Sequence, residues 1–263
     1  MAETAIEGRK IRYEIQGEGE TLFLIHGYLE TLEVWNDLAD LLSADYRVVR
    51  MDVPGHGKSD VMNGVHDMDL LAKAAGQVLD RHQIDSCSLI GHSMGGYIAL
   101  AFAEHYPKRL NRLCLFHSHP FADSEQVKGN RQQAIEQVRS GRKASIIRAH
   151  LPKTFADSNL EAFASKVEWL QTLALNIPEE GIIANLRGMM RRPDRSAMLK
   201  KFEKPFLLVA GKQDNFIDYN SIIPTIELPE KGRKVALAYS GHMGFIEEKE
   251  KSLDVIREFI ENG

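Results

Sequence analysis

Short apolar runs alternate along most of the chain with segments of helical spacing, and this alternation constrains the fold more than any other feature. Turn residues bound each run, as expected of buried strands: Ile11–Ile15, Thr21–Ile25, Tyr46–Met51, Ser86–Ile90, Arg112–Phe116, Pro205–Ala210 and Val235–Tyr239. Helical spacing is found at Val34–Ser43, Leu70–His82, Met94–His105 and Phe245–Phe259. The alternation predicts an α/β protein with a mainly parallel sheet covered by helices. The first two runs are close enough in sequence to predict an antiparallel hairpin at one edge.

One long segment breaks this alternation. Residues 121–204 contain no convincing strand and instead show helical patterns, at Ser124–Ser140, Lys143–Leu151 and Leu160–Leu175. This segment has 15 Lys/Arg and 10 Asp/Glu, whereas the rest of the chain has 18 and 27, so the net charge of −4 combines a basic segment with an acidic remainder. We predict a helical cap inserted into a catalytic core made of residues 1–120 and 205–263.

The composition excludes several classes of protein. A net charge of −4 provides no overall basic field for nucleic acid. No stretch of about 18 apolar residues occurs, so no membrane span is predicted, and the N-terminus lacks the apolar run of a secretion signal. Cys87 and Cys114 lie inside apolar runs, as buried reduced thiols do. We therefore expect a soluble cytoplasmic protein, whose oligomeric state the sequence leaves open.

The sharpest chemical signal is the stretch Gly91-His92-Ser93-Met94-Gly95-Gly96, which follows an apolar run and opens a helical pattern. A serine held at a tight strand-to-helix turn brings its neighbours two residues away close together, so Gly91 and Gly95 must lack side chains. Such a turn presents the Ser93 hydroxyl above the sheet, at the positive end of the following helix. The pattern predicts a nucleophile, although a glycine-rich turn with a solvated serine would carry the same residues.

A serine nucleophile needs a histidine base and an acid that orients the base. Asp214 follows the run Pro205–Ala210, and His242 follows the run Val235–Tyr239. Both therefore fall in turns beyond the carboxyl ends of successive strands, in the chain order Ser, Asp, His. Taken singly, each would more often be an ordinary turn residue.

Other residues compete for these roles. Asp123 is the second candidate for the acid, because it lies after the run Arg112–Phe116, and Asp218 is a weaker one. His117 and His119 would lie on one side of a strand and could bind a metal, but no third ligand is near in sequence, so we expect no metal. His92 lies within the turn, where its side chain is expected to point away from the chemistry.

The charge that develops on a substrate carbonyl oxygen needs preorganised donors. The turn supplies the backbone N–H of Met94, and the second donor is expected from the loop His26-Gly27-Tyr28-Leu29, where Gly27 permits a tight turn and the N–H of Tyr28 can face Ser93. Plain turn chemistry would also explain the pair His26-Gly27.

Together these motifs resemble the α/β-hydrolase-fold serine hydrolases of the compact bacterial esterase and lipase-like kind. The resemblance covers nearly the whole chain and includes the stretch from Asp52 to Ser59, Asp-Val-Pro-Gly-His-Gly-Lys-Ser, whose two end residues we assign structural roles. It implies an eight-stranded, mostly parallel sheet, Ser93 as nucleophile, His242 as base and Asp214 as its partner, with Tyr28 and Met94 as oxyanion donors.

The resemblance further implies hydrolysis of carboxylic esters with small or medium acyl chains, through an acyl-enzyme and without a cofactor. Thioester hydrolysis, carbon–carbon bond hydrolysis, cofactor-free perhydrolysis and elimination use the same catalytic set, so they remain alternatives. A receptor of the same fold, which binds a small molecule with weak or no turnover, is a second alternative. Serine at the turn disfavours the branches of the fold that use aspartate there.

Residues expected to bind the substrate are Leu29 and Met243 beside the catalytic turns, and Phe155 and Trp169 in the cap. An aromatic stripe at helical spacing, such as Phe155, Phe163, Trp169 and Leu173, more often forms the core of a cap. The cluster Arg187, Arg191, Arg192 and Arg195 could attract an acidic substrate, and a solvated basic helix face is the simpler explanation.

Overall fold

A single eight-stranded sheet forms the centre of the molecule in the computed structural model, which describes residues 2–6 and 8–262. Its spatial order is β1-β2-β4-β3-β5-β6-β7-β8. Strands β3 to β8 run parallel, whereas β2 pairs antiparallel with β1 and β4. The strands are β1 Ala2–Ile6, β2 Arg9–Gln16, β3 Thr21–Ile25, β4 Arg47–Met51, β5 Cys87–His92, β6 Leu110–Phe116, β7 Phe206–Gly211 and β8 Gly232–Leu237. This confirms the predicted fold class.

The hairpin expected between the first two apolar runs is wrong. These runs form β2 and β3, and β4 lies between them in the sheet. Every residue of β3 is buried, whereas β2 is buried only in its middle. A strand buried throughout needs a neighbour on both sides, and β4 and β5 supply them by parallel pairing, which needs longer connections than a hairpin.

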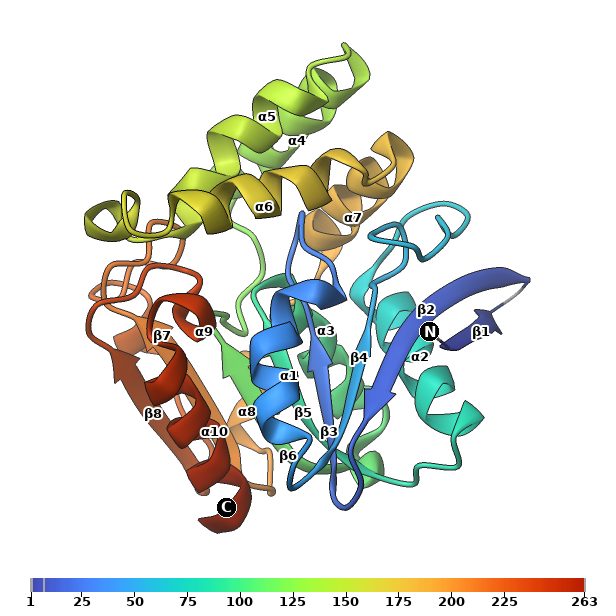
Figure 1. Cartoon of the computed structure of the whole chain (residues 1–263), viewed down its shortest axis with the longest axis vertical. Helices are drawn as coiled ribbons and strands as arrows, with labels where there is room; N and C mark the ends of the chain where they lie inside the picture. The colour runs from blue at the N-terminus through green and yellow to red at the C-terminus, as the bar shows by residue number, and fades with distance from the viewer. Residues whose placement is uncertain (1, 7, 263) are drawn as a thin grey trace.

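Helices cover both faces of the sheet (Figure 1). Helix α1 packs against α10, and α2 packs against α3. The segment predicted as one helix from Phe245 is divided, because α9 ends before Glu248 and α10 begins after it. These helices are α1 Asn36–Leu42, α2 Met68–Arg81, α3 Met94–His105, α9 Gly244–Glu247 and α10 Lys249–Asn262. Short 3-10 helices are η1 Leu32–Trp35, η2 Pro107–Arg109, η3 Leu151–Thr154, η4 Asp157–Asn159 and η5 Ile223–Thr225.

The segment 121–204 is helical and without a strand, and it lies between β6 and β7 in the chain. Its helices are α4 Glu125–Arg139, α5 Lys143–His150, α6 Ala164–Leu175, α7 Glu179–Arg191 and α8 Ser196–Lys200. Figure 1 shows α4 to α7 stacked beyond the carboxyl ends of the parallel strands. Helix α7 ends at Arg191 because Pro193 restricts Arg192 to an extended conformation. The domain boundaries stay a prediction.

Helix α7 holds this segment tightly on the loop after β4. The side chain of Asn185 is completely buried, and its Nδ2 donates a hydrogen bond to the carbonyl oxygen of Pro54 at 2.9 Å. A side chain at Gly181 would overlap the carbonyl group of Gly55, so the helix and the loop are in backbone contact. Residues 121–204, which lie beyond the strand ends, are therefore packed against the sheet domain. No helix in the described ranges is long and apolar enough to cross a bilayer.

Candidate active site

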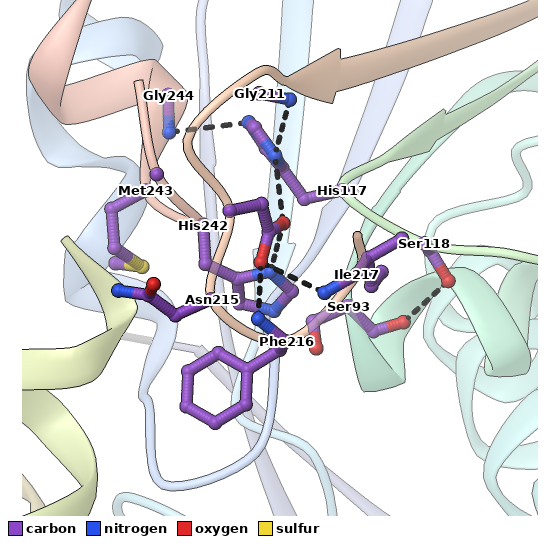
Figure 2. Close-up of polar contacts among 12 residues, drawn as sticks. Ser93, His117, Ser118, Gly211, Asn215, Phe216, Ile217, His242, Met243 and Gly244 are labelled. Carbon is purple, nitrogen blue, oxygen red and sulfur yellow. Dashed lines mark hydrogen bonds and ion pairs between the residues drawn. The ribbon is translucent and has the colours of Figure 1, made fainter. Parts of the chain in front are cut away.

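Ser93 occupies the sharp turn between β5 and α3. Its φ of 51° and ψ of −113° are strained for a residue with a side chain, as expected of a nucleophile at such a turn. A Cβ atom at Gly91 would overlap the carbonyl oxygen of Gly95, so glycine is required there. Ser118 donates a hydrogen bond to the carbonyl oxygen of Ser93 at 2.8 Å and holds the turn from β6 (Figure 2).

Asp214 and His242 meet beyond the carboxyl ends of β7 and β8. The Nδ1 atom of His242 lies 2.7 Å from Oδ2 of Asp214. The other oxygen of this carboxylate, Oδ1, accepts hydrogen bonds from the N–H groups of Phe216 (2.8 Å) and Ile217 (3.0 Å) (Figure 2). The carboxylate is therefore fixed by its own loop, and it orients the ring of His242.

This pair is strongly coupled electrostatically. Burial has the largest single effect and disfavours the charged form of His242, but the carboxylates of Asp214, Glu30 and Glu247 together outweigh it and raise the pKa of His242 above its ordinary value. Burial acts in the opposite sense on Asp214, yet His242 and His117 hold the pKa of that carboxyl well below its usual range. Asp214 is therefore ionised at neutral pH, as a partner that stabilises a protonated imidazole must be.

His117 is a further neighbour of Asp214. Its Nδ1 lies 3.4 Å from Oδ2 of Asp214 and 3.1 Å from the backbone nitrogen of Gly211, and its Nε2 lies 3.2 Å from the backbone nitrogen of Gly244 (Figure 2). Burial lowers the pKa of His117 to about 4, so the ring is neutral at neutral pH. The expectation that His117 and His119 share one face of a strand is wrong, because β6 ends at Phe116 and His117 has a φ of 48°.

A buried contact between Glu30 and His92 joins the loop of Gly27, the turn of Ser93 and the loop of His242. Glu30 Oε2 accepts a hydrogen bond from the N–H of Gly27 at 2.7 Å and lies 3.0 Å from Nδ1 of His92. The other ring nitrogen of His92, Nε2, lies 2.8 Å from the carbonyl oxygen of His242. The side chain of His92 thus points toward the loop of His242 and not away from it, contrary to expectation.

The ring of His92 lies between two hydrogen-bond acceptors. Burial acts to raise the pKa of Glu30, but His92, His26 and the N–H of Gly27 hold it below its ordinary value. The ionised carboxylate can only accept, and so can the carbonyl oxygen of His242. A Cβ atom at Gly27 would lie 2.7 Å from Glu30 Oε1 and 2.9 Å from the His92 ring, so the pair also requires this glycine.

The inserted segment contacts the His242 loop directly. The N–H of His242 donates to the carbonyl oxygen of Thr154 at 2.7 Å. Glu247, at the end of α9, accepts hydrogen bonds from the N–H of Gly241 (2.9 Å) and from the N–H of Ala156 (2.8 Å). The position of the histidine therefore depends on residues 121–204 as well as on the sheet.

Tyr28 lines the same cavity as Ser93, and Met94 directly follows Ser93 in the chain. Met94 is the first residue of α3, so its N–H has no partner inside the helix. In the described part of the chain, no hydrogen bond uses the N–H of Tyr28, whereas the next N–H, that of Leu29, donates to His56 Nε2 at 3.3 Å. Both N–H groups that we predict as donors can therefore donate a hydrogen bond to a substrate oxygen.

A cavity of about 630 Å³ lies beside Ser93 and His242, and its volume is within the size range of small-molecule sites. Its walls include Ser93, His242, Tyr28, Glu30, Phe121 and Phe216. Among the described residues no hydrogen bond joins the Ser93 hydroxyl to His242, a contact that often tightens only when substrate binds. The two side chains nevertheless line the same cavity.

The four residues expected to bind substrate do not line this cavity. Phe155 and Met243 are completely buried, and Phe155 stacks on Phe163. Leu29 is also buried, and Trp169 lies in a separate surface hollow with Lys166. The large apolar side chains next to these turns pack the loops and the inserted segment. For Phe155 this agrees with the alternative stated for the aromatic stripe, namely a place in the core of the cap.

The competing acids do not contact His242. Asp123 forms ion pairs with Arg131 and Arg192 and does not contact His242. Asp218 accepts from the N–H groups of Asn220 and Ser221 and so closes its own turn. Asp52 and Ser59 hold the loop after β4 through hydrogen bonds with Leu32, Arg12 and each other.

Two clusters of potential metal ligands occur among the described residues. One is His117, Asp214 and His242, whose ligand atoms are already engaged in the contacts above. The other is Asp69, Glu104 and His105 on the surface, where Arg195 forms ion pairs with both carboxylates. In both clusters the ligand atoms already have partners within the protein.

Comparison with known proteins finds relatives that cover nearly the whole chain. The chain is 27% identical over 254 residues to AB hydrolase superfamily protein YisY of Bacillus subtilis (strain 168), with 92% of each chain covered. It is 27% identical over 259 residues to the pimeloyl-acyl-carrier-protein methyl ester esterase of Photobacterium profundum, with 94% of this chain and 97% of that protein covered.

A similar solved structure is a thermophilic esterase from Thermogutta terrifontis with bound malate. It is 28% identical, with a TM-score of 0.93 over 99% of this chain and 96% of that one. The sequence profile of the alpha/beta hydrolase fold matches residues 20–249. The chain therefore belongs to the alpha/beta hydrolase fold family.

Proposed function

We propose that this protein is a serine hydrolase that cleaves carboxylic esters through an acyl-enzyme on Ser93. The Ser93 Oγ attacks the ester carbonyl carbon while His242 Nε2 takes the hydroxyl proton. The tetrahedral intermediate collapses as His242 returns this proton to the leaving alkoxide. Water, deprotonated by His242, then attacks the acyl-enzyme and releases the acid with Ser93 restored.

The observation that carries the proposal is the 2.7 Å contact between His242 Nδ1 and Asp214 Oδ2 in the cavity that Ser93 lines. This contact fixes the proton of the neutral ring on Nδ1 and leaves Nε2 as the base. It also stabilises the imidazolium that forms in both half-reactions. The N–H groups of Tyr28 and Met94 would receive the oxyanion.

Esters with small or medium acyl chains fit the cavity volume of about 630 Å³. The relatives support the ester class, since a methyl ester esterase and a thermophilic esterase are among them. The segment 121–204, which contacts the His242 loop through Thr154, is proposed as the cap that determines which substrates enter.

The test combines labelling with kinetics. A fluorophosphonate should modify Ser93 and add one adduct by mass spectrometry, and Ser93→Ala should lower p-nitrophenyl butyrate hydrolysis by about three orders of magnitude or more. Ser140→Ala is a matched control, because Ser140 is exposed at the end of α4. Labelling at a serine other than Ser93, or near-normal turnover of Ser93→Ala, contradicts the proposal.

The receptor alternative predicts a different time course. A hydrolase releases p-nitrophenol over many turnovers, whereas a receptor with a working triad stops after about one equivalent. Carbon–carbon bond hydrolysis is the other alternative that the relatives support, because a 2-hydroxy-6-oxononadienedioate hydrolase from Paraburkholderia phymatum is 29% identical over 233 residues. Turnover of a vinylogous 1,5-diketone faster than of any ester would favour that reaction.

A further inference from the structure

Two arginines converge on one carboxylate in the wall of the catalytic cavity. Arg131 Nε lies 2.7 Å from Asp123 Oδ2, and Arg192 Nη1 lies 2.6 Å from Asp123 Oδ1. All three residues line the cavity that also contains Ser93. The side chains of Arg192 and Asp123 are nearly inaccessible, with 3% and 1% exposed, whereas Arg131 retains 18%. Arg192 therefore does not belong to a solvated basic helix face.

This cluster carries one unbalanced positive charge. Burial acts to raise the pKa of Asp123, but Arg131 and Arg192 hold it below its ordinary value, so the carboxyl is ionised and offsets one guanidinium. Burial, assisted by Arg192, lowers the pKa of the adjacent His119 to about 3, and burial lowers the pKa of His150 to about 4. Both histidines are neutral at neutral pH. A partly buried excess charge is costly unless an anion accompanies it.

Hydrogen-bond donors in the cavity remain available. Within the described ranges, no hydrogen bond uses Nη1 of Arg131 or Nη2 of Arg192. The hydroxyl group of Tyr28 is buried without a partner, and it is close enough to Arg131 for that charge to act on it. Burial raises the pKa of Tyr28, so the hydroxyl keeps its proton and can donate. A buried hydroxyl without a partner points to a missing acceptor.

We propose that Arg131, Arg192 and the Tyr28 hydroxyl form a subsite for a carboxylate on the substrate, so that the preferred esters carry a free carboxyl group in addition to the ester. This inference rests on the proposed ester hydrolysis for its kinetic part. The guanidinium groups present planar pairs of N–H donors, which match the two oxygens of a carboxylate. A carboxylate bears a single charge and would balance the excess, whereas a phosphate dianion would leave the cluster negative.

The kinetic test uses pairs of esters that differ only in the anionic group. Mono-p-nitrophenyl glutarate places the carboxylate on the acyl side, and its neutral partner is p-nitrophenyl 5-methylhexanoate, where an isopropyl group replaces it. Carboxymethyl butyrate and isobutyl butyrate form the corresponding pair on the alcohol side. We expect a preference of roughly 10–100-fold in kcat/KM for the anionic member of at least one pair, since charge-assisted hydrogen bonds are involved.

Variants then test the residues. Arg131→Gln and Tyr28→Phe should each lower that preference by about tenfold, and Tyr28→Phe retains the backbone N–H proposed for the oxyanion. Arg139→Gln is the matched control, because Arg139 lies on the same helix, is exposed and changes the net charge equally. Its preference should equal that of the unaltered protein. Equal kcat/KM within both ester pairs, or equal loss in Arg139→Gln and Arg131→Gln, overturns the subsite.

A binding measurement separates this inference from the proposed reaction. Calorimetric titration of the Ser93→Ala protein with glutarate should give saturable binding that Arg131→Gln weakens, whereas glutaramide and inorganic phosphate should bind at least tenfold more weakly. Glutarate binding without ester turnover would contradict the hydrolase and leave the subsite intact. Ester turnover with no glutarate binding and no anionic preference would retain the hydrolase and refute the subsite, as would tighter binding of phosphate than of glutarate.

Discussion

The buried pair of Glu30 and His92 provides the most demanding test of the electrostatics of this site. Its contacts connect Gly27 in the proposed oxyanion loop, the nucleophile turn and the carbonyl oxygen of His242. The side chains of Glu30 and His92 are 3% and 0% exposed, so solvent screens their attraction little. The perturbation of choice is Glu30→Gln, which keeps the shape and removes the charge.

The expected cost follows from what Glu30→Gln leaves behind. A glutamine can still accept from the N–H of Gly27, but it replaces the charged carboxylate that lies 3.0 Å from Nδ1 of His92 by a neutral amide. The charge-assisted contact in this buried place is then lost. Breaking a buried pair typically costs about 3–5 kcal/mol, and an unsatisfied buried group about 1–3 kcal/mol. We expect a loss of about 3 kcal/mol, or about 6–12 °C in Tm for a chain of this size.

Urea denaturation followed by circular dichroism gives the free energy of unfolding, with the exposed Glu161→Gln as control. A double-mutant cycle with His92→Gln isolates the pair, because both single changes and the neutral pair are compared. We expect the double variant to lose less free energy of unfolding than the two single variants together, by about 1.5 kcal/mol or more. A loss in Glu30→Gln no larger than in Glu161→Gln, or strict additivity in the cycle, would refute the coupling between Glu30 and His92.

The same variant has a kinetic signature. The charge of Glu30 contributes to the raised pKa of His242. His242 acts as a base only when neutral, so activity rises with pH through this pKa. Removing the charge at position 30 lowers the pKa of His242 and moves the acid limb of the kcat/KM profile to lower pH. A shift to higher pH would contradict the assignment.

Two further substitutions and one labelling reaction test separate parts of the protein. Asp214→Asn should lower kcat by about 10³–10⁴-fold, with the acid limb of the profile again at lower pH because the larger charge contribution to His242 is lost; p-nitrophenyl ester kinetics measure both. Gly91→Ala introduces a methyl group that overlaps the carbonyl oxygen of Gly95, and it should abolish turnover and lower Tm in a thermal scan, whereas wild-type values would show that the turn relaxes easily. Cys87 and Cys114 are buried, and burial raises the pKa of Cys87 to about 12, so neither should react with Ellman's reagent until guanidinium is added; a fast-reacting thiol in the native protein would contradict their burial.

Much of the fold could be read from local patterns. Apolar runs and helical spacing predicted the parallel sheet, because a strand buried on both faces must be apolar along its length. Ser93, Asp214 and His242 each follow a predicted strand, and parallel strands bring their carboxyl ends to one edge. The predicted pairing of β2 with β3 was wrong, because the position of β4 between them depends on contacts between segments that are distant in the chain.

The supporting residues were harder to predict. Glu30 lies in a loop and belongs to no motif that we identified. Its partner His92 was expected to point away from the chemistry. For Arg192 the sequence left open a solvated basic helix face or the attraction of an acidic substrate, whereas in the structure its side chain is buried against Asp123. In each case the sequence contains the charged residue but not the identity of its partner, which comes from another element of the fold.

The amino-acid sequence by itself determined the class of fold, the order of the chemical groups and the glycines that the nucleophile turn requires, because these depend on periodicity and on sterics within a few residues. Only the tertiary structure decided which carboxylate faces His242, which side chains line the cavity and where a positive charge is left unbalanced. Those outcomes depend on distances between separate segments, and electrostatic and packing energies change steeply over a few ångströms. Asp214 and Asp123 illustrate this, since both follow strands of one sheet, yet one contacts a histidine and the other two arginines.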